Sequence, residues 1–130
     1  IYDTYRMWGI CLPAALAVSG ERGAFDAWLA RLITRRWDAE QHTWHDAAFL
    51  HGQIAEPEFL AQPHGLFASA DIHLLRAIRS DVAGRPQEAL PEYRAWLAVP
   101  AWQRSEMPEL TIDRFVAWRV AALQVDHPRQ

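Results

Sequence analysis

The chain has 130 residues, of which 51% are hydrophobic and 22% are charged, and its formal net charge is −3. This composition supplies the core of one ordinary domain, which we expect to span residues 1–130. The slightly acidic balance gives no overall attraction to nucleic acid or to an anionic membrane, so neither is expected as a partner. No apolar run approaches the roughly 20 residues that a membrane-spanning helix needs.

The start of the chain and its cysteine content give little information about the cellular compartment. The chain begins at Ile1 without a signal-peptide pattern, so we expect a processed chain or one domain of a longer protein. Nothing identifies a compartment, although the cytoplasm is favoured. Cys11 is the single cysteine, which excludes an internal disulfide framework, and its apolar neighbours predict a buried, unreactive thiol.

Apolar residues recur at helical spacing through the first half of the chain. The first such stretch is apolar nearly all round, which predicts a well-buried helix, and Pro13 within it should kink or split that helix. Asp38 is suited to cap the third helix, and Pro57 suits the first turn of the fourth. The predicted helices are Thr4–Ser19, Ala24–Arg36, Ala39–Ile54 and Glu58–Ala61.

The second half opens with the clearest pattern in the chain, a helix at Ala68–Val82 and a second helix, joined by a tight turn. Gly84 ends the first helix, Pro86 opens the second, and Pro91 predicts a bend in the second. The last predicted helix is Pro108–Leu123. No segment has the alternating β-branched pattern of a strand. The sequence therefore predicts an all-α fold of six to seven helices in antiparallel hairpins.

Seven tryptophans are many for a chain of this length. Two of them, Trp37 and Trp102, lie near helix junctions, where an aromatic side chain could line a binding groove. Four others fall on apolar stripes and are expected in the core: Trp28, Trp44, Trp96 and Trp118.

The hairpin of residues 68–99 resembles a tetratricopeptide-type helical hairpin. The residues that carry the resemblance are Gly84, Glu88, Ala89, Leu90, Tyr93 and Leu97. A fainter counterpart is formed by Ala24, Phe25, Trp28 and Leu32. The resemblance implies a right-handed array of hairpins around a concave groove that binds a protein or peptide. The alternative is an irregular helical bundle, whose hairpins look alike because all packed helical hairpins obey the same rules.

Three basic side chains, His73, Arg76 and Arg79, fall outside the apolar stripe of the 68–82 helix. We call them the basic strip. In a tetratricopeptide-like fold the first helix of each hairpin lines the groove, so this strip could bind an acidic peptide or a carboxylate. The alternative is a solvated face whose charges pair locally with Asp71 or Asp81.

A possible metal site lies around Asp38, His42 and His45, which are spaced to share one face of a helix. Such a set can hold zinc or iron, with the carboxylate completing or orienting the ligands. The alternative, an ordinary polar helix surface, is favoured because neither a His-Glu-x-x-His signature nor a second cluster is present. Other candidate ligands are Asp46, His51, His64 and His73.

No pattern supports nucleophilic catalysis, because a Gly-x-Ser-x-Gly motif, an activated cysteine and a phosphate-binding glycine loop are all absent from the sequence. The prediction is a protein- or peptide-binding helical-repeat scaffold with no catalytic residue, no cofactor and no indicated oligomeric state. The alternative is a helical metal-binding or metalloenzyme domain. The candidate partner-binding residues are His73, Arg76, Arg79, His42 and His45.

Overall fold

The computed structural model describes residues 5–34, 42–62, 67–104 and 110–126. These residues form seven α-helices and no strand, which confirms the all-α class and the expected number of helices. None of these helices is long and apolar enough to cross a membrane. The elements in chain order are η1 (Met7–Cys11, a π-helix), α2 (Leu12–Val18), α3 (Arg22–Thr34), α4 (His42–Leu50), α5 (Glu56–Leu60), α6 (Ala68–Val82), α7 (Pro86–Ala98), η2 (Ala101–Gln103, a 3-10 helix) and α8 (Leu110–Asp126).

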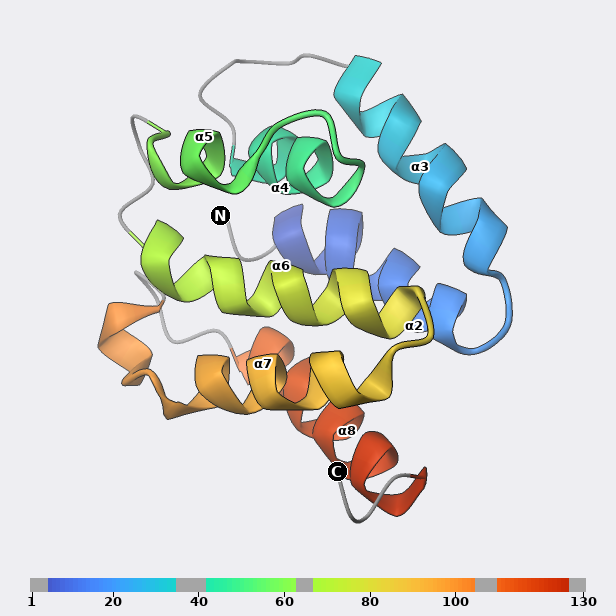
Figure 1. Ribbon diagram of the computed structural model, residues 1–130, viewed down its shortest axis with the longest axis vertical. Helices are drawn as coiled ribbons and strands as arrows, with labels where there is room; N and C mark the ends of the chain where they lie inside the picture. The colour runs from blue at the N-terminus through green and yellow to red at the C-terminus, as the bar shows by residue number, and fades with distance from the viewer. Residues whose placement is uncertain (1–4, 35–41, 63–66, 105–109, 127–130) are drawn as a thin grey trace.

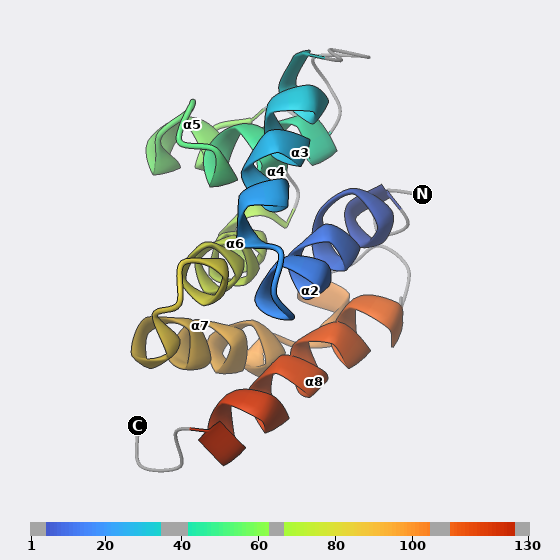
Figure 2. The ribbon, with the colours of Figure 1, turned by 90° about the vertical axis from the view of Figure 1, so that its right-hand side faces the viewer.

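Helix α6 lies at the centre of the molecule. It forms a hairpin with α7, and it also contacts α2, α4 and α5, while α8 packs on α7 and on η1 (Figures 1 and 2). Ten of its 15 residues are buried. The periodicity of the sequence predicted a single buried stripe on this helix. The buried surface of α6 is wider than that stripe, because other helices cover α6 on several sides.

The hairpin of α6 and α7 confirms the most explicit sequence prediction. Helix α6 has the predicted bounds and is followed by Gly84, whose φ of 77° lies in the left-handed region that favours glycine. Pro86 opens α7, and the helix continues through Pro91. The Arg22 guanidinium donates hydrogen bonds to the last carbonyls of α6, so the start of α3 is tied to the same turn.

Other helix boundaries differ from the expected ones. Helix α4 ends at Leu50 instead of Ile54, because Gly52 has a φ of 82° and the chain turns there. Helices α3 and α5 each begin two residues before their predicted starts, and α8 continues to Asp126. The Asp38 cap and the predicted start of the third helix lie outside the described residues.

Pro13 has the predicted disruptive effect in an unexpected form. The helix does not break, but its first part is a π-helix in which the Leu12 N–H bonds to the Met7 carbonyl. Pro13 has no N–H to donate to the Gly9 carbonyl four residues earlier. The Trp28 indole N–H of α3 donates to that carbonyl instead, at 2.7 Å. This bond joins the first helical segment to α3 next to the proline.

A buried arginine joins the start of the chain to α4 and α6. Arg6 Nε donates to Asp46 Oδ2 at 2.7 Å, and Arg6 Nη2 donates to Asp71 Oδ2 at 3.0 Å. All three side chains are almost completely buried. Burial opposes the charge of Arg6, but the two aspartates outweigh it and raise the pKa of the guanidinium well above its usual value.

A second buried cluster joins the far end of α6 to α7 and α8. Both carboxylate oxygens of Asp81 accept hydrogen bonds from Arg119, at 2.7 and 3.2 Å. Tyr93 Oη also donates to Asp81, at 2.8 Å. Burial, followed by the negative charge of Asp81, raises the pKa of Tyr93 well above its ordinary value.

We predict that replacing Arg6 with methionine destabilises the fold by about 3–5 kcal/mol at neutral pH, because Asp46 and Asp71 remain buried without their cation. Urea denaturation at neutral pH measures the loss. The control is Arg85→Met, which removes only an exposed pair with Glu88 and should cost at most about 1 kcal/mol. Equal losses in the two variants would contradict the prediction.

The raised pKa of Tyr93 predicts a loss of stability in alkaline solution. Above about pH 10 the unfolded phenol ionises while the folded phenol keeps its proton, so stability should fall by up to about 1.4 kcal/mol per pH unit. Tyr93→Phe should flatten this slope, whereas Trp102→Phe, which removes no ionisable group and lies at an exposed position, should leave it unchanged. Urea denaturation between about pH 9 and 11 measures the slopes. Identical slopes in wild type and Tyr93→Phe would disprove the assignment.

Candidate functional site

The first helical segment exposes three large apolar side chains on one face. Trp8 is 67% exposed, Leu12 37% and Leu16 58%. They are four residues apart, so they follow one another along the same side of η1 and α2. We call them the exposed stripe. The prediction of a helix buried all round is therefore wrong on this side, although the opposite side is buried through Ile10, Cys11, Ala14 and Ala17.

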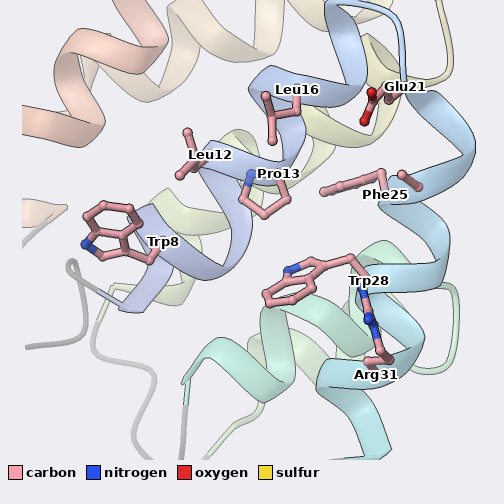
Figure 3. Close-up of a pocket in the computed structure, with 9 residues that line it drawn as sticks. Trp8, Leu12, Pro13, Leu16, Glu21, Phe25, Trp28 and Arg31 are labelled. Atoms are coloured by element: carbon pink, nitrogen blue, oxygen red, sulfur yellow. The ribbon is translucent and has the colours of Figure 1, made fainter.

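The exposed stripe borders a cleft between η1 and α2 on one side and α3 on the other (Figure 3). The cleft has a volume of about 270 Å³. Phe25 and Trp28 line it from α3, and Pro13 lies between them and the stripe. Because the hydrogen bond from Trp28 to the Gly9 carbonyl fixes the indole, the apolar lining is already assembled.

The two ends of the cleft carry opposite charges. Glu21 lies at the Leu16 end, and Arg31 lies at the other end beside Trp28, with its guanidinium carbon 5.3 Å from the indole centroid (Figure 3). Within the described part of the chain, neither charge forms an ion pair with another side chain. Both are exposed and can meet charges on an incoming molecule.

The basic strip is largely neutralised by glutamates. His73 Nδ1 lies 2.6 Å from Glu92 Oε2, and Arg76 Nε donates to Glu56 Oε1 at 2.6 Å. Arg79 stacks over a phenylalanine ring, with 4.5 Å from the guanidinium carbon to the Phe49 centroid. This surface is less basic than the sequence suggests, and the binding of an acidic partner to it stays a prediction.

The expected local pairing of the basic strip with Asp71 or Asp81 is wrong. Both aspartates are buried, and each pairs with an arginine from a distant part of the chain. The side chains of the basic strip and those of the two aspartates project from different sides of α6. Residues that are close in sequence therefore do not contact each other.

The proposed metal ligands are dispersed where the structure describes them. Asp46 is occupied by Arg6, and His51 lies 3.6 Å from Asp26. The ring of His45 packs edge-on against Trp44. No group of three or more histidine, cysteine, aspartate or glutamate side chains is placed to hold a metal among the described residues. The side chains of Asp38, His42 and His64 lie outside them, so zinc or iron at Asp38, His42 and His45 stays a prediction.

The four tryptophans expected in the core differ in exposure, and Trp28, which lines the cleft, is half-buried. Trp96 is buried as expected, and Trp44 is half-buried with its indole N–H bonded to the Ile33 carbonyl at 3.1 Å. Trp118 is 43% exposed, so its expected place in the core is wrong. The buried side of α8 is formed instead by Ile112, Phe115, Val116, Arg119 and Leu123.

Trp102 is 74% exposed on η2, and Trp37 lies outside the described residues. Trp8, which the sequence did not single out, is the tryptophan that joins an exposed apolar face to a cleft. Its signal in the sequence was present but ambiguous, because a helix that is apolar all round does not reveal which side lacks a neighbour.

No protein-family model matches the chain, and no curated protein or solved structure matches it either. The function is therefore argued from the geometry of the cleft and the exposed stripe.

We predict that Trp28→Phe destabilises the protein by about 1–2 kcal/mol, because the Gly9 carbonyl then loses the indole donor. Urea denaturation followed by circular dichroism measures the loss. Trp102→Phe, at an exposed position, is the matched control and should change stability by at most about 0.5 kcal/mol. If both variants are as stable as wild type, the indole bond does not hold the hairpin together.

Proposed function

We propose that this chain is a protein-binding domain that receives an apolar segment of a partner in the cleft between η1, α2 and α3. The observation that carries the proposal is the exposed stripe of Trp8, Leu12 and Leu16 beside a preformed apolar cleft. Contiguous apolar side chains that meet water on a protein surface mark binding sites, because covering them is favourable. Tryptophan is also among the residues that contribute most to protein interfaces.

The dimensions of the cleft favour a protein segment over a small molecule. Small-molecule pockets usually have volumes of roughly 300–1,000 Å³ and enclose most of their ligand. The cleft measures about 270 Å³ and is bordered by side chains that are largely exposed. It therefore suits one or two anchoring side chains whose backbone remains outside.

The charges around the exposed stripe favour a protein over a lipid surface. Helices that bind anionic membranes carry several basic residues on their polar face. Here the rim of the cleft supplies one glutamate, Glu21, and one arginine, Arg31. The net charge of the chain is also −3. An attraction to anionic lipid has no source in these residues.

The tetratricopeptide resemblance agrees with the proposal but changes its location. Phe25 and Trp28, which belong to the fainter counterpart of the 68–99 hairpin, line the cleft. Arrays of this kind bind partners through side chains of their helical hairpins. Membership of that family remains part of the proposal, and the first hairpin replaces the basic strip of α6 as the expected binding surface.

The test is a selection of binders from a display library of random peptides of about 16 residues, with the intact chain as the target. We expect selected peptides to bind wild type and to lose about tenfold or more in affinity for Leu16→Glu, measured by calorimetry, because a charge then stands in the apolar contact. Leu60→Glu is the matched control: Leu60 is 43% exposed on α5, away from the cleft, and this variant should bind like wild type.

Two results would refute the proposal. One is a selection that yields no binder. The other is a set of binders whose affinity is equal for wild type and for Leu16→Glu, which would place the binding surface elsewhere. The melting temperature of each variant is compared with that of wild type, so that a loss of folding is not taken for a loss of binding.

A further inference from the structure

Resting on the proposed function, we infer that the partner segment is an amphipathic helix with a basic end beside Glu21 and an acidic end beside Arg31. The inference follows from the scarcity of hydrogen-bonding groups along the cleft, from the spacing of the exposed stripe and from the charges at the two ends.

The cleft offers almost no hydrogen-bond partner for a peptide backbone. The side chains that line it are apolar apart from Glu21 and Arg31 at its ends and the indoles of Trp8 and Trp28, so polar groups do not repeat along it as backbone groups repeat along a peptide. The indole N–H of Trp28 is already bonded to the Gly9 carbonyl. An extended peptide in the cleft would leave N–H and C=O groups unpaired, which is costly away from water. A helix pairs these groups internally and can therefore lie against apolar side chains.

The described residues also provide no sheet edge to which an extended peptide could add as a strand. The exposed stripe advances in steps of four residues, so it forms one of the ridges by which helices pack against each other. From the turn at residues 19–21, η1 and α2 diverge from α3 (Figure 2), and the cleft lies between these two arms of the hairpin. A third helix lying over the cleft would contact both arms.

The charges at the ends of the cleft set the direction of this helix. Ten residues separate Glu21 from Arg31, which corresponds to roughly 15 Å along α3. A partner helix with opposite charges about ten residues apart can pair with both at once. An isolated helix is most stable with acidic residues in its first turn and basic residues in its last. Such a helix would run antiparallel to α3, with its C-terminal end at Glu21.

A second copy of the chain fits this surface less well than a separate helix. Stable interfaces between whole proteins involve roughly 20–30 residues on each side. The exposed stripe has three residues, and the cleft admits one or two side chains. Recognition of a helix in a groove requires only a few anchors at spacings of three and four residues, which matches the scale of this surface.

The experiment uses the tightest peptides from the display selection described above and the intact chain. We expect them to carry apolar residues at i, i+4 and i+7, a basic end and an acidic end. Circular dichroism and NMR chemical shifts should show that the bound peptide is helical. A proline in the middle of the peptide should weaken binding by about tenfold or more, because it breaks the helix. Alanine at the same exposed position is the control and should have little effect.

The direction of the helix is tested with a nitroxide on the basic end of the peptide. It should broaden the amide signals of Glu21 and its neighbours more strongly than those near Arg31. The single variants Glu21→Arg and Arg31→Glu should each weaken binding by roughly threefold to tenfold at low salt. In the Glu21→Arg/Arg31→Glu double variant, the nitroxide effect should move to the residue 31 end.

Several outcomes would overturn the inference while the proposed function stands. Peptides that bind the cleft in extended form, or that tolerate the proline, would exclude a helix. Equal broadening at both ends would exclude a fixed direction. A dimer of the wild-type chain in sedimentation, abolished by Leu16→Glu, would make a second copy the occupant. Binding to vesicles of zwitterionic lipid that depends on Leu16 would make a membrane the occupant, and this result alone would overturn the proposed function together with the inference.

Discussion

The fold depends on ion pairs that α6 forms at both of its ends. Asp71 binds Arg6, which precedes η1, and Asp81 binds Arg119 of α8, so one helix holds the first and the last of the described helices. Buried ion pairs add little net stability, because removing two charges from water offsets their attraction. Their main effect is to disfavour other packing arrangements of the helices. Any arrangement that separates an aspartate from its arginine leaves an unpaired charge in the core. We regard these pairs as the feature that makes this helical packing unique.

The sequence predicted the structural features that depend on residues close together in the chain. Gly84 and Pro86 mark the α6–α7 turn within three residues, and the bounds of α6 were correct. The sequence did not predict the ion pairs of Arg6. Asp46 and Asp71 lie 40 and 65 residues after Arg6, so they form no local pattern with it. The cleft was missed for a related reason. Periodicity identifies which side chains are apolar, but only the arrangement of the helices decides which of them find a neighbour.

The cleft and the core share the same short segment. One side of η1 and α2 is buried through Ile10 and Ala14, and the other exposes Leu12 and Leu16. Substitutions on the buried side change stability, whereas those on the exposed side should change recognition alone. Because Trp28 connects the two arms of this hairpin, the shape of the cleft is fixed before a partner arrives.

The π-helix at Met7–Cys11 links the two roles through chain length. A π turn holds one residue more than the α-helical turn it replaces, so the residues before it are rotated by about 100° relative to those after it. With the extra residue, Arg6 points into the core while Leu12 and Leu16 face outward. If this turn were one residue shorter, either Arg6 would no longer point into the core or Leu12 and Leu16 would no longer face outward. The number of residues in the first helical segment is thus constrained twice, by the ion pairs of the core and by the exposed stripe.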